Sequence, residues 1–351
     1  MSHRGLTLGI PPRTAPTGVP QRGAPGTVTF LARAEREPGP EWRSFFEACA
    51  PAYRAWYLSD GDAARPDLGT CRRMLARHMP ELVPVHQRLV ELAGADALDA
   101  RMLSLYNPPA FVSGCSQVAW TRDAPILVRN YDYPPSRLEG LLVLTEWGKR
   151  QVLGMSDCLW GLLDGINDAG LALSLTFGGS VARGEGFAVP LVLRYILEVC
   201  DTVKQACEIL ARVPIHTSQN VTLLDRRGDF MTAYIAPEGP TRFQRTRVST
   251  NHQETVQWPA YERAVHSLAR EAFLTRLLAE PGLTLDGLLA AFLAAPLYSP
   301  SHLTGSGTLY TAAYFPAEGR VELLWPHERW SESFDCFQEL ARTETYHQQA
   351  A

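Results

Sequence analysis

The chain has 351 residues, of which 46% are hydrophobic and 20% are charged, and its formal net charge is −4. This composition is typical of a soluble globular protein with room for one large domain or two ordinary ones. The small net charge gives no reason to expect nucleic acid or an anionic membrane as a partner. No apolar run approaches the ~18 residues of a membrane span, so we expect no membrane-spanning segment.

The termini and the cysteines predict the compartment. The segment 1–5 lacks the continuous apolar core of a secretory signal, so we expect a cytoplasmic protein. The seven cysteines are odd in number, scattered and without a C-x-x-C pair. This pattern is typical of reduced thiols rather than disulfides or a zinc site, so we expect neither a metal nor a cofactor.

The part of the chain before residue 110 is predicted to be mainly helical. Residues 1–27 are rich in Pro, Gly, Arg and Thr and are expected to be loosely structured, with a short strand over 27–32. Apolar residues then recur at helical spacing. The predicted helices span 41–58, 70–78, 80–92 and 98–105. The helical region ends at Asn107-Pro108-Pro109, where a helix cannot continue.

Strands dominate the rest of the chain. The strand-like runs span 141–146, 170–177, 220–224, 230–235, 308–315 and 320–324. Two helical stretches interrupt them, 190–213 and 261–294, and each is expected to hold a pair of helices. This order is expected if helices cover both faces of antiparallel sheets, so we predict an α+β fold.

One stretch carries a candidate for chemistry. Cys115 follows Gly114 and begins a short alternating run, and a polar turn at 121–123 leads to a second apolar run that delivers Arg129 and Asp132. Two such runs predict antiparallel strands, so Arg129 should return close to Cys115. A cation beside a thiol favours the nucleophilic thiolate. Asp132 can hold Arg129, or it can bind an ammonium group at Cys115.

The arrangement Gly-Cys-Ser, a hairpin and then Arg-Asn-x-Asp resembles the N-terminal-nucleophile hydrolases of the penicillin acyltransferase group, called C45 peptidases. Their more distant relatives are the bile-salt hydrolases and penicillin V acylases. In these proteins the precursor cuts its own Gly-Cys bond, and the freed cysteine is both nucleophile and base. The resemblance implies self-cleavage between Gly114 and Cys115 and a four-layer αββα sandwich. It covers residues 100–325 and is most specific over 115–132.

The resemblance also implies further site residues. Ser249-Thr250-Asn251-His252 resembles the turn whose Asn serves the oxyanion hole, which implies that role for Asn251. Residues 173–179 resemble a strand end that carries a pocket Asn in bile-salt hydrolases and a Tyr in penicillin V acylases; this chain has Thr176 there. The remaining candidates for the oxyanion site or an acyl pocket are Asn220, Phe177 and Trp147.

Each assignment has a structural alternative. Cysteine is among the most buried residue types, so Cys115 could be inert, and the other six cysteines are interpreted as core residues. Arg129 and Asp132 could form a structural ion pair, and Asn251 could simply accommodate a turn. Core packing is the default for Phe177 and Trp147.

The chemistry can also be argued without the resemblance. A cysteine at a new N-terminus carries an α-amine with a pKa near ~7.7–8.0, which can accept the thiol proton without any histidine. Attack on an amide carbonyl gives an acyl-enzyme, which water or a second amine resolves. The tetrahedral intermediate needs oxyanion donors, which an Asn side chain and backbone N–H groups can supply.

Three functions are therefore considered. The leading hypothesis is a self-processing N-terminal-cysteine amidohydrolase acting on a linear non-peptide amide, such as an N-acyl amino acid, a β-alanyl amine or an acylated β-lactam. The second is an acyltransferase with coenzyme A thioester as co-substrate and an amine as acceptor. The third is a papain-like protease or a non-catalytic ligand-binding relative, although residues 114–117 lack the Cys-Gly-Ser-Cys-Trp pattern of papain-like enzymes.

The same hypothesis divides the chain at the cleavage bond. Residues 1–114 are predicted to form a helical pro-segment, and 115–351 the catalytic core that starts at the nucleophile. Because 1–114 contains several apolar helices, the two fragments are expected to remain associated as a heterodimer.

Overall fold

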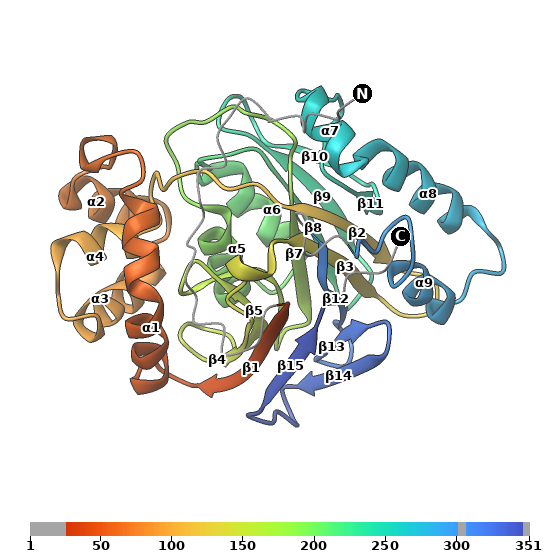
Figure 1. Cartoon of the computed structure of the whole chain (residues 1–351), viewed down its shortest axis with the longest axis horizontal. Coiled ribbons are helices and arrows are strands. Elements are labelled where there is room, and N and C mark those ends of the chain that lie inside the picture. The colour runs from red at the N-terminus through yellow and green to blue at the C-terminus, as the bar shows by residue number, and fades with distance from the viewer. Residues whose placement is uncertain (1–25, 301–306, 347–351) are drawn as a thin grey trace.

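The computed structural model describes residues 26–300 and 307–346, and two β-sheets stacked between helices organise this part of the chain (Figure 1). The strands of the larger sheet are β1 (Thr27–Glu35), β4 (Leu141–Thr145), β5 (Val152–Asp157), β6 (Gly161–Asn167), β7 (Leu171–Phe177), β8 (Gln219–Asp225), β9 (Phe230–Ile235), β10 (Arg242–Gln244) and β15 (Ala341–Thr345). The strands of the smaller sheet are β2 (Gly114–Trp120), β3 (Ile126–Tyr133), β11 (Val248–Ser249), β12 (Gly307–Phe315), β13 (Arg320–Trp325) and β14 (Glu328–Ser333).

The strand order brings distant segments together. The nine-stranded sheet has the order β10-β9-β8-β7-β6-β5-β4-β1-β15, and the six-stranded sheet has the order β11-β2-β3-β12-β13-β14. The predicted hairpin is confirmed: β2 and β3 are antiparallel, with Cys115 opposite Tyr131 and Gln117 opposite Arg129. β2 and β3 also contact β7 of the other sheet, so the two sheets pack face to face around this hairpin.

Helices cover the outer faces of both sheets. On the larger sheet, α5 (Val189–Val199) and α6 (Val203–Arg212) pack against the strands β6 to β9. On the smaller sheet lie α7 (Pro259–Val265), α8 (Ser267–Ala279) and α9 (Leu285–Phe292), of which α8 contacts β2 and α9 contacts β3. The order helices, sheet, sheet, helices is the four-layer αββα arrangement, so the predicted α+β fold class is confirmed.

The N-terminal segment contains the predicted helices and adds one strand to the core. The helices are α1 (Pro40–Tyr57), α2 (Leu68–His78), α3 (Val83–Leu92) and α4 (Ala97–Leu103), joined by the short 3-10 turns η1 (Asp62–Ala64) and η2 (Pro80–Leu82), and a third such turn, η3 (Pro135–Arg137), follows β3. The strand β1 lies between β4, to which it is parallel, and β15, to which it is antiparallel. The larger sheet is therefore not built from residues 115–351 alone.

Alternation along β2 decides where the cysteine lies. Val118 and Trp120 pack in the apolar cluster that also contains residues of α8 and α9. Cys115, Gln117 and Ala119 occupy the alternate positions, which point to the opposite face of a strand. The Ser174 hydroxyl on β7 donates a 2.5 Å hydrogen bond to Gln117, which bridges the two sheets. Cys115 consequently lies between the sheets.

The strands β5, β6, β10, β14 and β15 were not predicted. The predicted loose structure of 1–25 lies outside the described residues. Among the helices within 26–300 and 307–346, none is long and apolar enough to cross a membrane.

Candidate active site

Cys115 and Arg129 meet as the hairpin predicts. Arg129 Nη2 donates a hydrogen bond to Cys115 Sγ over 3.1 Å, and both side chains are fully buried. Arg129 lies diagonally across the ladder from Cys115, because its direct partner is Gln117. Residues two positions apart share a strand face, so the spacing of the hairpin suffices to place a cation beside the sulfur.

Arg129 is held by a carboxylate that sequence analysis did not identify. Its Nη1 donates to Asp164 Oδ2 on β6 over 2.5 Å and to the Leu163 carbonyl over 3.1 Å. Asp164 also accepts hydrogen bonds from the hydroxyls of Tyr310 and Tyr314 on β12. Asp132 was one expected partner of Arg129, whereas the observed ion pair is formed with Asp164 and crosses from one sheet to the other.

Burial and charge act on the Cys115 thiol in opposite directions. Removal from solvent raises its pKa above the ordinary value, Arg129 and Arg270 lower it, and Asp132 raises it. The net direction is upward, so in the intact chain the thiol is the stable form at neutral pH. The expected stabilisation of the thiolate by Arg129 is present, but desolvation outweighs it.

The Gly114–Cys115 peptide bond lies against Asn251. The Cys115 N–H donates a 2.8 Å hydrogen bond to Asn251 Oδ1. Asn251 Nδ2 donates in turn to the carbonyls of Ser113, over 3.2 Å, and Phe177, over 3.3 Å. The predicted turn residue therefore contacts the chain on both sides of Gly114.

Two donors converge on the Ser113 carbonyl. Besides Asn251 Nδ2, the Tyr261 hydroxyl on α7 donates to this oxygen over 2.5 Å. The Tyr261 ring is fixed by Phe177, with the ring planes at 88° and the centroids 5.2 Å apart. A carbonyl that receives two hydrogen bonds is held in one place, so this pair positions the residue that precedes Gly114.

Arg270 on α8 is a second buried cation at the site. Its Nη2 donates to Asn251 Oδ1 over 2.8 Å, and its Nη1 donates to Ser116 Oγ over 2.6 Å and to the Cys115 carbonyl. Arg270 thus fixes the side chain that receives the Cys115 N–H.

Asp132 lies opposite Gly114 in the β2–β3 ladder. Its Oδ1 accepts a 2.7 Å hydrogen bond from the Thr308 hydroxyl. A Cβ atom at position 114 would lie 3.0 Å from Asp132 Cβ and 3.2 Å from Oδ2. The absence of a side chain at Gly114 therefore permits the close approach of this carboxylate.

Thr176 and Asn220 support the turn that carries Asn251. The Thr176 hydroxyl donates to the Thr250 carbonyl over 2.7 Å, and Asn220 Nδ2 donates to the carbonyls of Thr250 and His252, both over 2.9 Å. These donors are used on the backbone of the turn. Thr176 and Asn220 therefore act on Cys115 only through the turn that holds Asn251 in place.

Trp147 and His252 lie outside the immediate contacts of Cys115. Trp147 Nε1 donates to the Glu35 carbonyl over 2.9 Å, and its ring faces Arg194 in the wall of a cavity of about 280 Å³ between α1, β1, β4 and α5. Cys115 does not line that cavity. His252 contacts Ser267 and Glu271 rather than the sulfur.

Sequence reasoning missed Asp164, Tyr261 and Arg270. Asp164 is the single charged residue in the apolar run of β6, which is the signal that could have marked it. Arg270 and Tyr261 lie in helical sequence and give no such signal, because only the packing of α7 and α8 against β2 brings them to Cys115. Within residues 26–300 and 307–346, the one cluster of three metal-ligating side chains is His327, Glu328 and Glu344, none of which belongs to this site.

This sandwich, with a Gly-Cys bond on an inner strand, is the architecture of the N-terminal-nucleophile hydrolases. Within that class, the chain belongs to the acyl-coenzyme A:6-aminopenicillanic acid acyl-transferase family, whose sequence model matches residues 120–330. The expected resemblance to the penicillin acyltransferase group is confirmed. The curated proteins include none that matches it significantly.

The solved structures that are similar to this chain include the following three. A conjugated bile acid hydrolase mutant from Clostridium perfringens has 12% identity and a TM-score of 0.45, and the match covers 66% of this chain and 97% of that one. Penicillin V acylase from Agrobacterium tumefaciens has 14% identity and a TM-score of 0.43, and the match covers 65% of this chain and 90% of that one. The Caenorhabditis elegans N-acylethanolamine-hydrolyzing acid amidase ortholog has 14% identity and a TM-score of 0.44, and the match covers 66% of this chain and 99% of that one.

Proposed function

We propose that the chain is a self-processing amidohydrolase that cuts its Gly114–Cys115 bond and then cleaves a linear non-peptide amide through an S-acyl-enzyme on Cys115. The observation that carries this proposal is how the Gly114–Cys115 peptide unit and the thiol of Cys115 are held. Its N–H rests on Asn251 Oδ1 at 2.8 Å, and the thiol of the same residue is 3.1 Å from Arg129.

Self-cleavage needs no reagent other than water. Cys115 Sγ attacks the Gly114 carbonyl carbon, the C–N bond breaks, and the nitrogen takes up the thiol proton to become a free α-amine. Water then hydrolyses the resulting thioester, which leaves a carboxylate on Gly114 and restores the thiol. Asn251 Oδ1 already holds that nitrogen, and the carboxylate of Asp132 lies beside Gly114, where it would stabilise the amine in its protonated form.

The donors on Ser113 are suited to substrate turnover rather than to self-cleavage. In the intact chain Asn251 Nδ2 and Tyr261 bind the Ser113 carbonyl, one residue before the carbonyl that is attacked. Departure of residues 113 and 114 frees both donors, and we propose that they then receive the substrate carbonyl as it becomes an oxyanion. The α-amine of Cys115 serves as the base in this second reaction.

The amide substrate remains defined only by class: an N-acyl amino acid, a β-alanyl amine or an acylated β-lactam. An acyltransferase is the second candidate, because the family that matches residues 120–330 is described by acyl transfer from coenzyme A. The acyl-enzyme is common to both reactions, and they differ in whether water or an amine accepts the acyl group. Release of coenzyme A thiol from an acyl-CoA, dependent on an added amine, would favour transfer.

Intact mass under denaturing conditions tests the first step. We expect wild type to give two fragments that meet between Gly114 and Cys115, and Cys115→Ala to give one uncut chain. Cys49→Ala, which removes another buried thiol, should still be cut. An uncut wild-type chain, or cleavage of Cys115→Ala, would contradict the mechanism and favour the ligand-binding alternative.

A further inference from the structure

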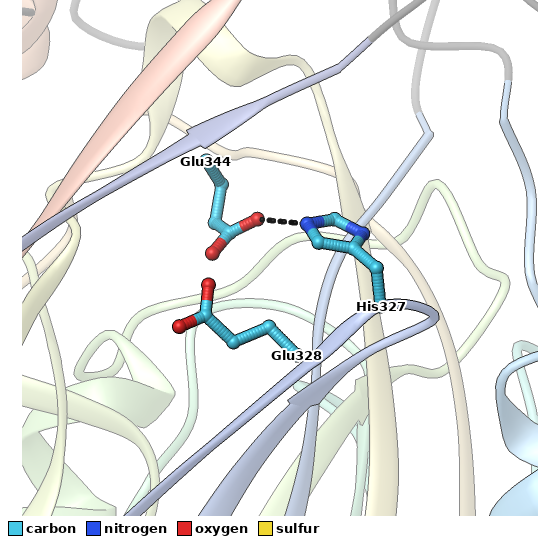
Figure 2. Close-up of side chains that lie close together, drawn as sticks. All are labelled: His327, Glu328 and Glu344. Atoms are coloured by element: carbon cyan, nitrogen blue, oxygen red, sulfur yellow. Dashed lines mark hydrogen bonds and ion pairs between the residues drawn. The ribbon is translucent and has the colours of Figure 1, made fainter.

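We propose that His327, Glu328 and Glu344 form a site for a divalent transition-metal cation, with zinc as the first ion to test, at the junction of the two sheets. Their ligand atoms, one from each side chain, all lie within 4.8 Å of one another. Figure 2 shows the three side chains converging from two directions.

The three residues come from different sheets. His327 lies in the turn between β13 and β14, and Glu328 begins β14 at the edge of the six-stranded sheet. Glu344 lies on β15, opposite Val28 at the edge of the nine-stranded sheet. A cation bound by all three would link the edge strands of the two sheets. Sequence spacing gave no sign of such a site, because it depends on how β14 and β15 pack.

One carboxylate oxygen at this junction lacks a partner. The Glu344 side chain is only 2% exposed; its Oε2 lies 3.1 Å from His327 Nε2, whereas its Oε1 is buried with no hydrogen-bond partner among the described residues. In Figure 2 this second oxygen is directed toward the carboxylate of Glu328. Burying an unpaired carboxylate oxygen is costly, and facing it with a second carboxylate adds repulsion, so the geometry favours a cation between them.

The donor set fits zinc in both type and spacing. Zinc binds imidazole nitrogen and carboxylate oxygen at about 2.0–2.2 Å, which puts two ligands of a tetrahedral ion about 3.4 Å apart. The observed 3.1 Å between His327 Nε2 and Glu344 Oε2 is close to that spacing. His327 and Glu328 are 64% and 41% exposed, so both can adjust without disturbing the core. A water molecule would complete the coordination.

Arg342 is the group that competes with a metal. It precedes Glu344 by two residues on β15, pairs with Glu328 Oε1, and leaves the other oxygen of Glu328 available. Its positive charge should weaken cation binding. Arg342→Gln is therefore expected to tighten the site, which separates a real metal site from adventitious binding elsewhere.

Calorimetric titration of the metal-stripped full chain with zinc chloride tests the proposal. Every variant carries Cys336→Ser, because Cys336 is an exposed thiol that would itself bind zinc. We expect one saturable zinc per chain and a rise of a few degrees in Tm at a hundredfold excess over Kd. His327→Ala and Glu344→Gln should each weaken binding by about tenfold or more, and Arg342→Gln should strengthen it.

His266→Asn is the matched control. His266 is an exposed histidine on another face, and asparagine tolerates its positive φ of 50°. Its replacement should leave zinc affinity unchanged. Absence of a saturable one-to-one site overturns the proposal, as does binding that neither His327→Ala nor Glu344→Gln weakens. A folded Glu344→Gln chain with raised Tm, beside a parent chain that zinc does not stabilise, would likewise overturn the proposal, because the cost of burying Glu344 would then be unrelieved by a metal.

Discussion

At the scale of single residues, Asn251 links the precursor to the proposed enzyme. Its oxygen holds the nitrogen of Cys115, which is an amide before cleavage and would be an amine after it. Its Nδ2 shares the Ser113 carbonyl with the Tyr261 hydroxyl, and that carbonyl would leave the site with the cut end. One arrangement of side chains could thus serve two successive reactions with different carbonyl groups.

This double use predicts that Tyr261→Phe separates the two reactions. The hydroxyl contacts Ser113 rather than the attacked carbonyl, so self-cleavage should change by no more than a few fold. Loss of one oxyanion donor should reduce kcat on an amide substrate by about 10²–10³. Cleavage is followed by intact mass and turnover by amine release from the processed protein.

Tyr57→Phe is the matched control for that experiment. The Tyr57 hydroxyl is buried on α1 with no hydrogen-bond partner among the described residues, so its removal should affect neither reaction. Equal losses of cleavage and turnover in Tyr261→Phe would show that the tyrosine only supports the fold.

At the scale of elements, the β5–β6 hairpin carries a titratable group whose ionisation opposes folding. Desolvation, followed by the nearby charge of Glu139, raises the pKa of Asp157 to about 8, far above the value near 3.9 of an unfolded aspartate. A carboxyl with a raised folded pKa contributes stability that is complete below the unfolded value and is lost as pH rises toward 8. Asp157→Asn, which cannot ionise, should escape that loss.

The expected result is a stability gain that grows with pH. Relative to wild type, the unfolding free energy of Asp157→Asn should rise by at most about 1.4 kcal/mol per pH unit between pH 5 and 8. Denaturant unfolding at three pH values measures it, in the Cys115→Ala background so that the chain stays whole. For the control Asp201→Asn the difference from wild type should not vary between pH 5 and 8. Desolvation raises the pKa of the Asp201 carboxyl, but pairing with Arg150 outweighs it and lowers the net pKa, so this group is ionised in both states throughout that range. A difference for Asp157→Asn that does not vary with pH would contradict the assignment.

The elements that could be predicted are those with local signals. Period-two apolar runs and a polar turn define the hairpin that contains Cys115, and helical periodicity defines α1 and the helix pairs. The β5–β6 hairpin was missed because Cys158 and Leu159 take φ values of 57° and 72° in its turn, where Asn-Gly would be the usual signal. A residue distant in the sequence holds that turn: Trp42 Nε1 donates a hydrogen bond to the Leu159 carbonyl over 2.9 Å. Arg270 and Tyr261 were missed for the same reason, since tertiary packing alone brings them to the site.

At the scale of the whole molecule, the two predicted fragments share a hydrogen-bonded sheet. The strand β1 lies between β4 and β15, and Trp160 Nε1 donates to the Leu103 carbonyl over 2.8 Å. Cutting the chain after Gly114 leaves these contacts in place. We therefore expect residues 1–114 and 115–351 to co-elute as one species under native conditions and to separate only in denaturant.

Size-exclusion chromatography followed by denaturing mass analysis checks that expectation. The uncut Cys115→Ala chain should elute at the same volume as the processed pair. Loss of the small fragment from a large fragment that remains folded would show that β1 is dispensable for the sheet.

The pairing of β1 with β15 joins the first described strand to the last. During translation, Cys115 leaves the ribosome before Asn251, Arg270 and Tyr310 have been made, and β1 waits for its outer neighbour until synthesis is nearly complete. The long sequence separation makes assembly slow, since loop closure must precede these contacts. In the proposed mechanism this separation would also set when the chain is cut. A nascent chain lacks the groups that surround Cys115, so cleavage would be delayed until the two parts of the chain can pack together.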